Sequence, residues 1–552
     1  MNNFLKRTLI VSFFGITLLT FVGFRAIEDR YFEIAKNLDI FATLYKEVNA
    51  FYVDEINPNE LMRTGINAML NSLDPYTDYI PEDDIENYRT MTTGQYGGIG
   101  ALVGRRGGVN TVIMPYEGFP AHRAGLKIGD QILKINGVDL ADKNTDEISR
   151  LLKGQSKTGI TLLIKRYGND ETFEVQLERE KITIDNVPFY GMVTSDIGYI
   201  KLSDFTTDAG KEVRDALKEL KEKGAAKLIF DLRGNPGGLL DEAVKVSNVF
   251  VPKGAEIVST KGKVSNSNVT YPAPGSPVDT EMPLVVLTSS GSASAAEIVA
   301  GVIQDYDRGV LVGRKTFGKG LVQTTRPLSY NSQLKITTAK YYIPSGRCIQ
   351  AIDYSHRNPD GSIGRIPDSL KVAFTTRNGR KVYDGGGVDP DIEVEETNLA
   401  SITIAMINRN LLFDYATRYN FEHDQIASAK EFKLSDADYN EFVNWLSDKD
   451  LSYETSVERT LDRLEKAAKE ERYYDDISDA LQSFKETATF NKKDDLKRFK
   501  DEITYMLEEE IVSRYYYESG IVEASFDDDP DVKTAVEVLN DSGRYSGLLK
   551  GN

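Results

Sequence analysis

Apolar residues recur at helical spacing in the N-terminal part of the chain, over residues 28–90. The repeating positions include Ile34, Leu38, Phe41, Leu44, Tyr45 and Val48. Asn57-Pro58 marks a boundary, and the pattern predicts a second helix that opens at Asn59-Glu60 and runs through Leu70. This part of the chain is therefore expected to be helical.

Strand-like, glycine-rich patterning follows from Gly94 to about Arg179. Within it, Asn136-Gly137 separates two short apolar runs and suits a type I′ hairpin, because such a turn needs positive φ at both positions. Asn144 followed by Glu147 predicts a capping box at the start of a short helix over residues 146–153. These signals predict several strands and one short helix.

Residues 181–395 alternate between strand and helix patterns. Lys227–Phe230 and Leu284–Leu287 are short apolar runs typical of buried strands, and each is followed by a glycine-rich turn and a helical pattern. Such alternation predicts an α/β core.

After Thr397 the sequence becomes helical in pattern and highly charged, as in segments 461–469 and 499–515. This pattern predicts an auxiliary helical domain whose charged faces are solvated. The whole chain is thus expected to be a multidomain α+β protein with helical regions at both ends.

The composition excludes several classes of function. A length of 552 residues predicts several domains, and a net charge of -18 argues against a nucleic-acid partner, which would need clustered Lys and Arg. The single cysteine, Cys348, permits no intrachain disulfide and is expected to be a small apolar filler. The three histidines, His122, His356 and His423, have no metal-ligand spacing, so we expect no metal and no other cofactor.

Residues 8–24 carry no charge and follow Lys6-Arg7, as in a secretory signal or a signal-anchor. No A-x-A cleavage site is evident, which favours an uncleaved anchor, although cleavage stays open. The preceding basic residues place the amino terminus in the cytoplasm and the rest outside. We expect a protein of the bacterial cell envelope on the periplasmic side, anchored to the inner membrane by residues 8–24, or secreted to the periplasm if cleaved.

Two segments favour a serine nucleophile activated by a lysine base. Ser294 follows a buried apolar run and opens a helical pattern, where free N–H groups and the helix dipole can stabilise an oxyanion. Lys319 lies between Gly318 and Gly320, where the backbone can approach closely. A lysine base must lose its charge, so its pKa has to fall from about 10.4 to roughly 7–8, which burial favours. The apolar neighbours expected to exclude water from it are Phe317, Leu321 and Val322.

Spacing alone leaves other interpretations open. The serines that could simply form turns and helix caps are Ser289, Ser290, Ser292 and Ser294, and Lys319 could be a surface lysine. Ser332 and Lys335 match S-x-x-K, but they lie in a strand-like segment, where positions i and i+3 face opposite sides, and not on the helix that motif requires. No G-x-S-x-G motif occurs in the chain.

Three segments, 231–239, 290–301 and 316–323, closely resemble the carboxy-terminal processing (tail-specific) peptidases. That family uses a serine nucleophile, a lysine base 25 positions later and a glutamine four positions beyond it. The resemblance implies these roles for Ser294 and Lys319. It implies that Gln323 orients the lysine amine, from the same face of a strand.

The same resemblance implies an oxyanion hole formed by the Ala295 N–H and one glycine N–H, from either Gly237 or Gly238. Glu297, three residues after the nucleophile, also matches a recurrent family position and is expected to be a support residue.

A further resemblance joins residues 95–101 and 121–137 to the PDZ domains that these proteases carry. Consecutive glycine N–H groups can capture a peptide's terminal carboxylate, while the adjacent strand edge pairs with its backbone. The loop implied to do so comprises Gly97, Gly98, Ile99 and Gly100. His122 is then a loop residue without a catalytic role.

These implications predict five regions: 1–27, a signal-anchor or signal peptide; 28–90, a helical region; 91–181, a PDZ domain; 182–398, a crotonase/Clp-protease-like α/β protease core; and 399–552, a charged helical domain. The expected function is a serine endopeptidase that binds the free, apolar C-termini of envelope proteins and cleaves through an acyl-enzyme. A catalytically silent PDZ scaffold and a non-proteolytic hydrolase or hydratase on a crotonase-like core are the alternatives. A homo-oligomer and an activating partner stay open.

Overall fold

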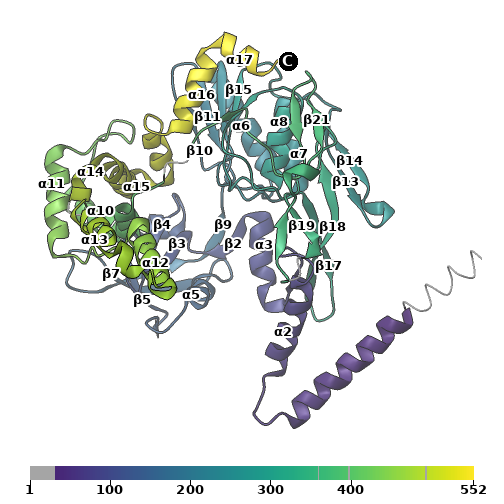
Figure 1. Ribbon diagram of the computed structural model, residues 1–552, viewed down its shortest axis with the longest axis horizontal. Helices are drawn as coiled ribbons and strands as arrows, with labels where there is room; N and C mark the ends of the chain where they lie inside the picture. The colour runs from purple at the N-terminus through teal and green to yellow at the C-terminus, as the bar shows by residue number, and fades with distance from the viewer. Residues whose placement is uncertain (1–30, 358–359, 396–397, 492–493, 552) are drawn as a thin grey trace, which may run out of the picture. The chain divides into compact units, whose positions relative to one another are not determined.

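The computed structural model describes residues 31–357, 360–395, 398–491 and 494–551 (Figure 1). The chain divides into two compact units, Met1–Tyr79 and Ile80–Asn552. The predicted membrane segment, residues 8–24, lies outside the described residues. Within the described part of the chain, no helix combines the length and apolar character needed to cross a membrane.

The first unit contains a helix over residues 31–51 and α2 (Pro58–Asn71). The Asn57 side chain caps α2 by accepting hydrogen bonds from the N–H groups of Asn59 and Glu60. Because proline suits the first helical position, α2 begins one residue earlier than Asn59, where the sequence predicted it. β1 (Asp78–Ile80) spans the boundary between the two units.

An antiparallel sheet follows, with strand order β3-β4-β5-β7-β8 and β6 added to β5. Its strands are β3 (Ala101–Arg106), β4 (Val109–Pro115), β5 (Gln131–Ile135), β6 (Val138–Asp139), β7 (Gly159–Lys165) and β8 (Phe173–Glu178), with β2 (Gln95–Gly98) and β9 (Glu180–Thr183) forming a separate pair. The helical elements nearby are η1 (Glu82–Asp84), α3 (Ile85–Thr93), α4 (Pro120–Arg123) and α5 (Thr145–Leu152). β3 is an edge strand of the sheet.

Local sequence signals in this region are confirmed. Asn136 and Gly137 have φ of 50° and 78°, as the hairpin between β5 and β6 requires. The Asn144 side chain accepts from the Glu147 N–H at 3.0 Å, and the Glu147 carboxylate accepts from the Asn144 N–H at 2.9 Å, which forms the predicted capping box at α5.

A six-stranded sheet forms the core of the larger unit, with strand order β10-β11-β12-β15-β16-β23. β10 runs antiparallel to β11, and the remaining neighbours are parallel. The strands are β10 (Phe189–Met192), β11 (Ile197–Lys201), β12 (Lys227–Asp231), β15 (Leu284–Thr288), β16 (Val310–Gly313) and β23 (Ile392–Glu393). The helices between them are α6 (Ala209–Glu222), α7 (Leu240–Phe250) and α8 (Ala295–Asp305).

Both faces of this sheet are buried. Alternate residues of a strand point to opposite faces, so Leu284 and Val286 of β15 pack in the cluster that holds α6, α7 and α8. Val285 and Leu287 pack in a second cluster, which holds the C-terminal helix α16. The two predicted buried strands are thus β12 and β15, covered on both sides.

A second, antiparallel sheet lies beside the core, in which β13 pairs with β14 and β18, and β18 pairs with β17. Its strands are β13 (Glu256–Gly262), β14 (Val269–Pro272), β17 (Leu321–Pro327) and β18 (Gln333–Tyr342). The smaller elements are η2 (Ser265–Ser267), β19 (Ile352–Arg357), β20 (Ile363–Arg365), η3 (Asp368–Leu370), β21 (Ala373–Thr375) and β22 (Lys381–Tyr383).

The C-terminal region is helical, as predicted. Its elements are α9 (Ser401–Asn408), α10 (Leu411–Glu422), α11 (Asp436–Trp445), η4 (Leu446–Asp448), α12 (Ser456–Glu471), α13 (Tyr474–Asn491), α14 (Asp495–Arg498), α15 (Lys500–Ser525), α16 (Pro530–Asn540) and α17 (Ser542–Leu548). α9, α10, α11 and α15 share an apolar core of their own. α16 instead contacts β12, β15 and β16 of the core sheet (Figure 1). The sequence predicted an auxiliary helical domain with solvated charged faces and did not predict this packing.

Candidate active site

Three loops meet where the parallel strands of the core sheet end. One follows β12 and contains Gly237 and Gly238, one follows β15 and contains Ser294, and one follows β16 and contains Lys319. The carboxyl ends of parallel strands are the usual place for a binding site in α/β proteins. The structure therefore brings together, at this edge, residues that lie far apart in the sequence.

Ser294 occupies the sharp turn between β15 and α8. Its φ of 55° and ψ of -112° are uncommon for a residue with a side chain, and such strain is often retained at functional sites. The Ser294 C=O accepts two hydrogen bonds, from the Ile298 N–H at 3.0 Å and from the Tyr341 hydroxyl at 3.0 Å. The turn leaves the Ser294 side chain partly exposed to solvent.

The buried carboxylate of Glu297 ties the serine turn to the lysine loop. Its Oε2 accepts from the Ser294 N–H at 2.8 Å and from the Lys319 N–H at 2.9 Å. Its Oε1 accepts from the Gly318 N–H at 2.7 Å and from the Thr316 hydroxyl at 2.6 Å. One side chain at the start of α8 thus fixes the backbone of both predicted catalytic residues.

Burial and hydrogen bonding act in opposite directions on this carboxyl group. Glu297 is completely buried, and desolvation raises its pKa to about 7, although the four donors around it favour the charged form. Because all four neighbours donate, protonation of Glu297 would place an O–H where the site supplies hydrogens. Above about pH 7 the carboxylate predominates, and this form can accept a hydrogen bond from each of the four donors.

The two glycines that flank Lys319 permit close backbone approach, as predicted. Gly318 has a φ of 91°, and a Cβ at this position would lie 2.3 Å from the Ala351 Cβ. A Cβ at Gly320 would lie 2.8 Å from the Gln350 nitrogen. Lys319 itself is half-buried. Of the residues expected to exclude water from Lys319, Leu321 is buried, with an exposed fraction of 7%, whereas Phe317 is 42% exposed and does not fit that expectation.

The loop after β12 lies directly against the serine turn. A Cβ added at Gly237 would come within 2.8 Å of the Ala295 nitrogen. The Gly237 N–H already donates to Asn235 Oδ1 at 2.8 Å. Within the described part of the chain, no acceptor is recorded for the N–H groups of Gly238 and Ala295. Of the two glycines left open by the sequence, Gly237 is thus the one whose N–H is already engaged within its own loop.

Gln323 lies on β17, where its Nε2 donates to the Thr337 hydroxyl of β18 at 3.1 Å. The premise that it shares a strand face with Lys319 is wrong. β17 begins only at Leu321, and the register with β18 shifts between Val322 and Gln323. A bulge re-aims side chains, so counting four residues along a strand does not apply here.

The neighbouring serines have structural partners. Ser292 is fully buried, its hydroxyl donates to the Leu232 C=O at 2.7 Å, and it accepts from the Ser289 N–H at 3.0 Å. The Ser289 hydroxyl accepts from the Gly234 N–H at 3.0 Å. Ser332 precedes β18 and its hydroxyl donates to the Ser329 C=O at 2.8 Å, outside this site.

Thr316 and Tyr341 belong to the site but were not found from the sequence. The Thr316 hydroxyl accepts from the Val388 N–H at 2.7 Å and donates to the Glu297 carboxylate. Tyr341 is buried in β18 and reaches the Ser294 carbonyl. The position of Thr316 within the Thr-Phe-Gly-Lys-Gly segment, three residues before Lys319, could have indicated a role in the site. Tyr341 could not have been found in this way, because in the sequence it resembles any aromatic residue of a strand.

The predicted carboxylate loop has two different parts. Gly97 and Gly98 lie in β2 and pair with Lys181 and Glu180 of β9. Ile99 and Gly100 form the turn into the edge strand β3, with the Ile99 side chain 2% exposed and Gly100 at a φ of 71°. No acceptor is recorded, among the described residues, for the N–H groups of this turn. His122 lies in the single-turn helix α4 and accepts from the Gly118 N–H at 3.2 Å.

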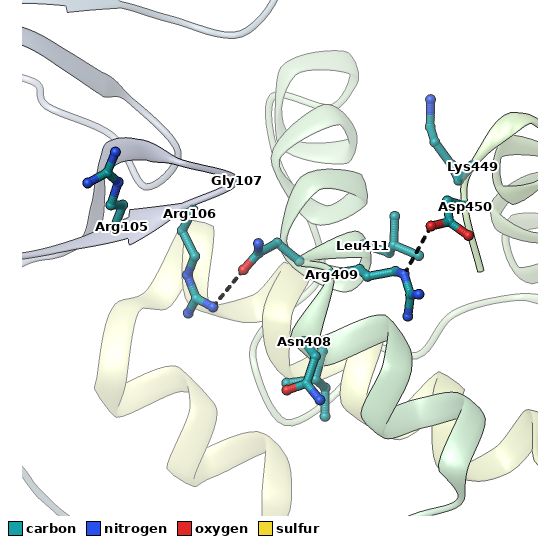
Figure 2. A pocket seen from close by; sticks show the side chains of 10 residues that line it. Arg105, Arg106, Gly107, Asn408, Arg409, Leu411, Lys449 and Asp450 are labelled. Carbon is teal, nitrogen blue, oxygen red and sulfur yellow. Dashed lines mark hydrogen bonds and ion pairs between the residues drawn. The ribbon is translucent and has the colours of Figure 1, made fainter. Parts of the chain in front are cut away.

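A cavity of about 680 Å³ opens between the β3–β4 hairpin turn and the C-terminal helices. Figure 2 shows Arg106 of the hairpin reaching an acceptor across it, Asn410 Oδ1 at 2.8 Å, and Arg409 paired with Asp450. None of its lining residues is a predicted site residue.

Comparison with known families matches three parts of the chain. Residues 196–363 match peptidase family S41, and residues 112–166 match the PDZ domain family. Residues 402–539 match a family described as the C-terminal helical domain of probable PDZ-proteases.

Individual proteins match over longer stretches. A carboxy-terminal-processing protease from Bartonella bacilliformis is 39% identical over 321 residues, which cover 57% of this chain and 73% of the relative. A probable CtpA-like serine protease from Staphylococcus aureus is 32% identical over 382 residues, which cover 69% of this chain and 75% of the relative. Among solved structures, the photosystem II D1 C-terminal processing protease is 27% identical with a TM-score of 0.34, and the match covers 64% of this chain and 92% of that one.

Proposed function

The chain belongs to the carboxy-terminal-processing proteases of peptidase family S41, and from this we propose its function. It captures free C-terminal tails and cleaves the captured polypeptide with Ser294 and Lys319. Family membership makes it a serine protease with a PDZ domain that binds peptide C-termini. The roles of individual residues, the acyl-enzyme and the nature of the substrate are our proposals.

The observation that carries the proposal is the shared carboxylate of Glu297. Ser294 and Lys319 donate their backbone N–H groups to the same Oε2 atom, at 2.8 and 2.9 Å. A nucleophile and its base act together only if their separation is fixed, because a displacement of about 1 Å costs about 10²-fold in rate. A buried group that holds both loops supplies this rigidity.

Acylation begins when the uncharged Lys319 amine takes the proton of the Ser294 hydroxyl. The serine oxygen attacks the scissile carbonyl carbon, and the carbonyl oxygen becomes an oxyanion that accepts from the N–H groups of Ala295 and Gly238. The tetrahedral intermediate collapses as the C–N bond breaks. The lysine ammonium returns its proton to the leaving amine, and an ester to Ser294 remains.

Deacylation repeats these steps with water. Lys319, uncharged again, takes a proton from a water molecule that attacks the ester carbonyl, and the same two N–H groups stabilise the second oxyanion. The C–O bond to Ser294 breaks, the proton returns to the serine oxygen, and a new carboxylate terminus leaves. We assign Gln323 to orienting the lysine amine, in line with the family resemblance.

Tail capture uses the edge strand β3 and the turn before it. An extended peptide can add to a strand edge by main-chain hydrogen bonds, and its terminal carboxylate then meets the N–H groups at Ile99 and Gly100. Gly97 and Gly98 support this turn through their pairing with β9. We propose that the tails are apolar, because the edge strand β3 itself exposes an apolar side chain, Leu102, whose exposed fraction is 50%.

We further propose that residues 8–24 hold the enzyme at the periplasmic side of the inner membrane of a bacterial envelope. The support is their uncharged composition after Lys6-Arg7. Membrane fractionation, with protease digestion of spheroplasts, tests this location. Recovery of the chain in the cytosolic fraction would contradict it.

A peptide cleavage assay tests the function. A soluble fragment from residue 28 is incubated with peptides that end in apolar residues, bearing either a free or an amidated C-terminus. We expect cleavage of the free peptide and much weaker cleavage of the amidated one. Binding of the tail without any cleavage would favour the silent scaffold, and equal cleavage of both peptides would remove tail recognition from the proposal.

A further inference from the structure

The helix α16, near the end of the chain, carries two aspartates to the catalytic edge of the core sheet. α16 contacts β12, β15 and β16, and its apolar residues Val532, Ala535 and Val538 are buried in the cluster beneath the sheet. Asp529 caps the helix and Asp531 lies in its first turn. The Asp531 side chain is 2% exposed, so its charge is placed inside the protein.

Both aspartates bind Arg233, which belongs to the loop after β12. One guanidinium nitrogen donates to Asp529 Oδ2 at 2.7 Å and to Asp531 Oδ2 at 2.9 Å. The opposite side of the guanidinium is held by Asp231, at distances of 2.6 to 3.0 Å. Burial opposes the charge on Arg233, but the surrounding carboxylates outweigh it and raise the pKa of the guanidinium.

Asp531 also binds the loop after β16. An Arg314 nitrogen lies 3.3 Å from the same Oδ2 atom that Arg233 contacts. Arg314 is fixed to the end of β15, because its N–H donates to the Thr288 C=O at 2.9 Å and its C=O accepts from the Thr288 hydroxyl at 2.8 Å. One carboxylate oxygen therefore joins two arginines from two different loops.

Each loop leads within five residues to a group of the proposed catalytic site. From Arg233 the chain runs through Asn235, which accepts from the Gly237 N–H, to Gly238. From Arg314 it runs through Thr316, which donates to Glu297, to Lys319. The oxyanion donor and the base thus sit on loops whose other ends converge on Asp531.

We propose that Asp531 is a positioning residue that sets the distance between the oxyanion loop and the lysine loop, and that Asp529 is a positioning residue that holds Arg233 of the oxyanion loop in place. The C-terminal region is then part of the catalytic apparatus through α16. This inference rests on the proposed roles of Ser294, Lys319 and Gly238. It does not depend on tail capture by the PDZ domain.

Two variants remove the charges while preserving shape. Asp529→Asn keeps the helix cap, because asparagine caps as well as aspartate and Oδ1 still accepts from the N–H groups of Asp531 and Val532. Asp531→Asn removes the charge shared by the two arginines. The matched control is Glu537→Gln, which removes one charge from the exposed side of the same helix and leaves Arg233 untouched.

Full-length variants are compared by steady-state cleavage of a free-tailed peptide, together with wild type and Ser294→Ala. We expect kcat to fall about 10- to 100-fold for Asp531→Asn, and less for Asp529→Asn, with KM within about twofold, since displaced catalytic groups lose rate and not tail affinity. Glu537→Gln should match wild type. The double variant Arg314→Gln with Asp531→Asn should lose less than the product of the single losses, because the two share one contact.

The outcomes separate the two proposals. Turnover by Ser294→Ala would contradict the proposed function itself. An inactive Ser294→Ala alongside wild-type kcat in both aspartate variants would overturn the positioning role and leave the proposed function intact. If Asp531→Asn melts below the assay temperature, Asp529→Asn decides alone, and a raised KM with unchanged kcat in that variant would also contradict the inference.

Discussion

The Ser292 hydroxyl is fully buried and already donates to the Leu232 C=O, whereas Ser294 stands at a strained turn with its side chain partly exposed. We predict that Ser294→Ala lowers kcat by about 10⁴-fold or more while melting temperature and tail binding stay unchanged. Ser292→Ala should instead cost about 1–3 kcal/mol of stability, because it leaves a buried carbonyl without its donor. Kinetics and thermal unfolding of both variants test this. An active Ser294→Ala beside an inactive Ser292→Ala would mean that the nucleophile is misassigned.

Glu297 predicts a specific pH dependence of stability. Its pKa is raised from 4.5 to about 7 in the folded protein, so the folded state binds this proton more tightly than the unfolded state. Its contribution to the free energy of unfolding is therefore fully present below about pH 4.5 and is lost as the pH rises through about 7. Integrated over this shift, the loss is about 3 kcal/mol.

The variant Glu297→Gln cannot titrate and should not show this loss. We expect the difference in unfolding free energy between Glu297→Gln and wild type to change by about 3 kcal/mol between about pH 4 and pH 8. Urea unfolding at both pH values measures it. We also expect kcat to fall at least about tenfold, because an amide –NH₂ would face the backbone N–H donors of the site. A difference that is the same at both pH values would refute the assignment of this titration to Glu297.

At the scale of elements, the turn between β2 and β3 is predicted to govern tail binding. A Cβ at Gly100 would lie 2.4 Å from the Phe119 Cβ, so Gly100→Ala must displace the turn. Gly107 lies in the β3–β4 hairpin with a similar positive φ of 54°, but a Cβ there meets nothing within 4 Å. We expect Gly100→Ala to weaken binding of a free-tailed peptide at least about tenfold and Gly107→Ala to leave it unchanged. Fluorescence anisotropy with labelled peptides measures both, and equal losses would point to strain alone.

Which elements the sequence could predict depended on how local their causes are. The Asn136-Gly137 hairpin and the Asn144–Glu147 capping box each rest on contacts within a few residues, and both are confirmed. The bulge at Gln323 arises from pairing between β17 and β18, which no local pattern records. Glu297 could be named as a support residue, but its four donors come from two loops that meet only in the fold.

At the scale of the whole molecule, the resemblance to carboxy-terminal processing peptidases and the multidomain α+β fold are confirmed by the family matches. The sequence did not predict that the last part of the C-terminal region packs on the protease sheet. α10, α11 and α15 build a separate core, and then Asp529 and Asp531 return to the protease sheet through α16. The charged composition describes the C-terminal region as a whole. It therefore could not distinguish α16, which packs on the protease sheet, from the helices that build the separate core.

The burial of α16 predicts that the protease core cannot fold stably without it. Val532, Val538 and Leu539 are at most 4% exposed, and full burial of three such side chains is worth roughly 6 kcal/mol. That is comparable to the whole stability of a typical domain, about 5–15 kcal/mol. Removal of residues 527–552 would also expose Tyr199, Val285 and Val312, which share their cluster.

We therefore expect a chain truncated after Phe526 to lose the cooperative unfolding transition of the core, as measured by calorimetry, along with all cleavage. The control deletes the arm formed by α12 and α13, residues 456–491, and replaces it with a short glycine-serine linker. The described side chains of this arm belong neither to the two clusters of the core sheet nor to the separate C-terminal core. The deletion should therefore preserve the cooperative unfolding transition of the protease core. A separately supplied peptide of residues 527–552 should restore part of the lost stability, because α16 would dock on the same apolar face. A truncated chain that unfolds cooperatively at the wild-type temperature would show that α16 only covers the sheet and does not stabilise it.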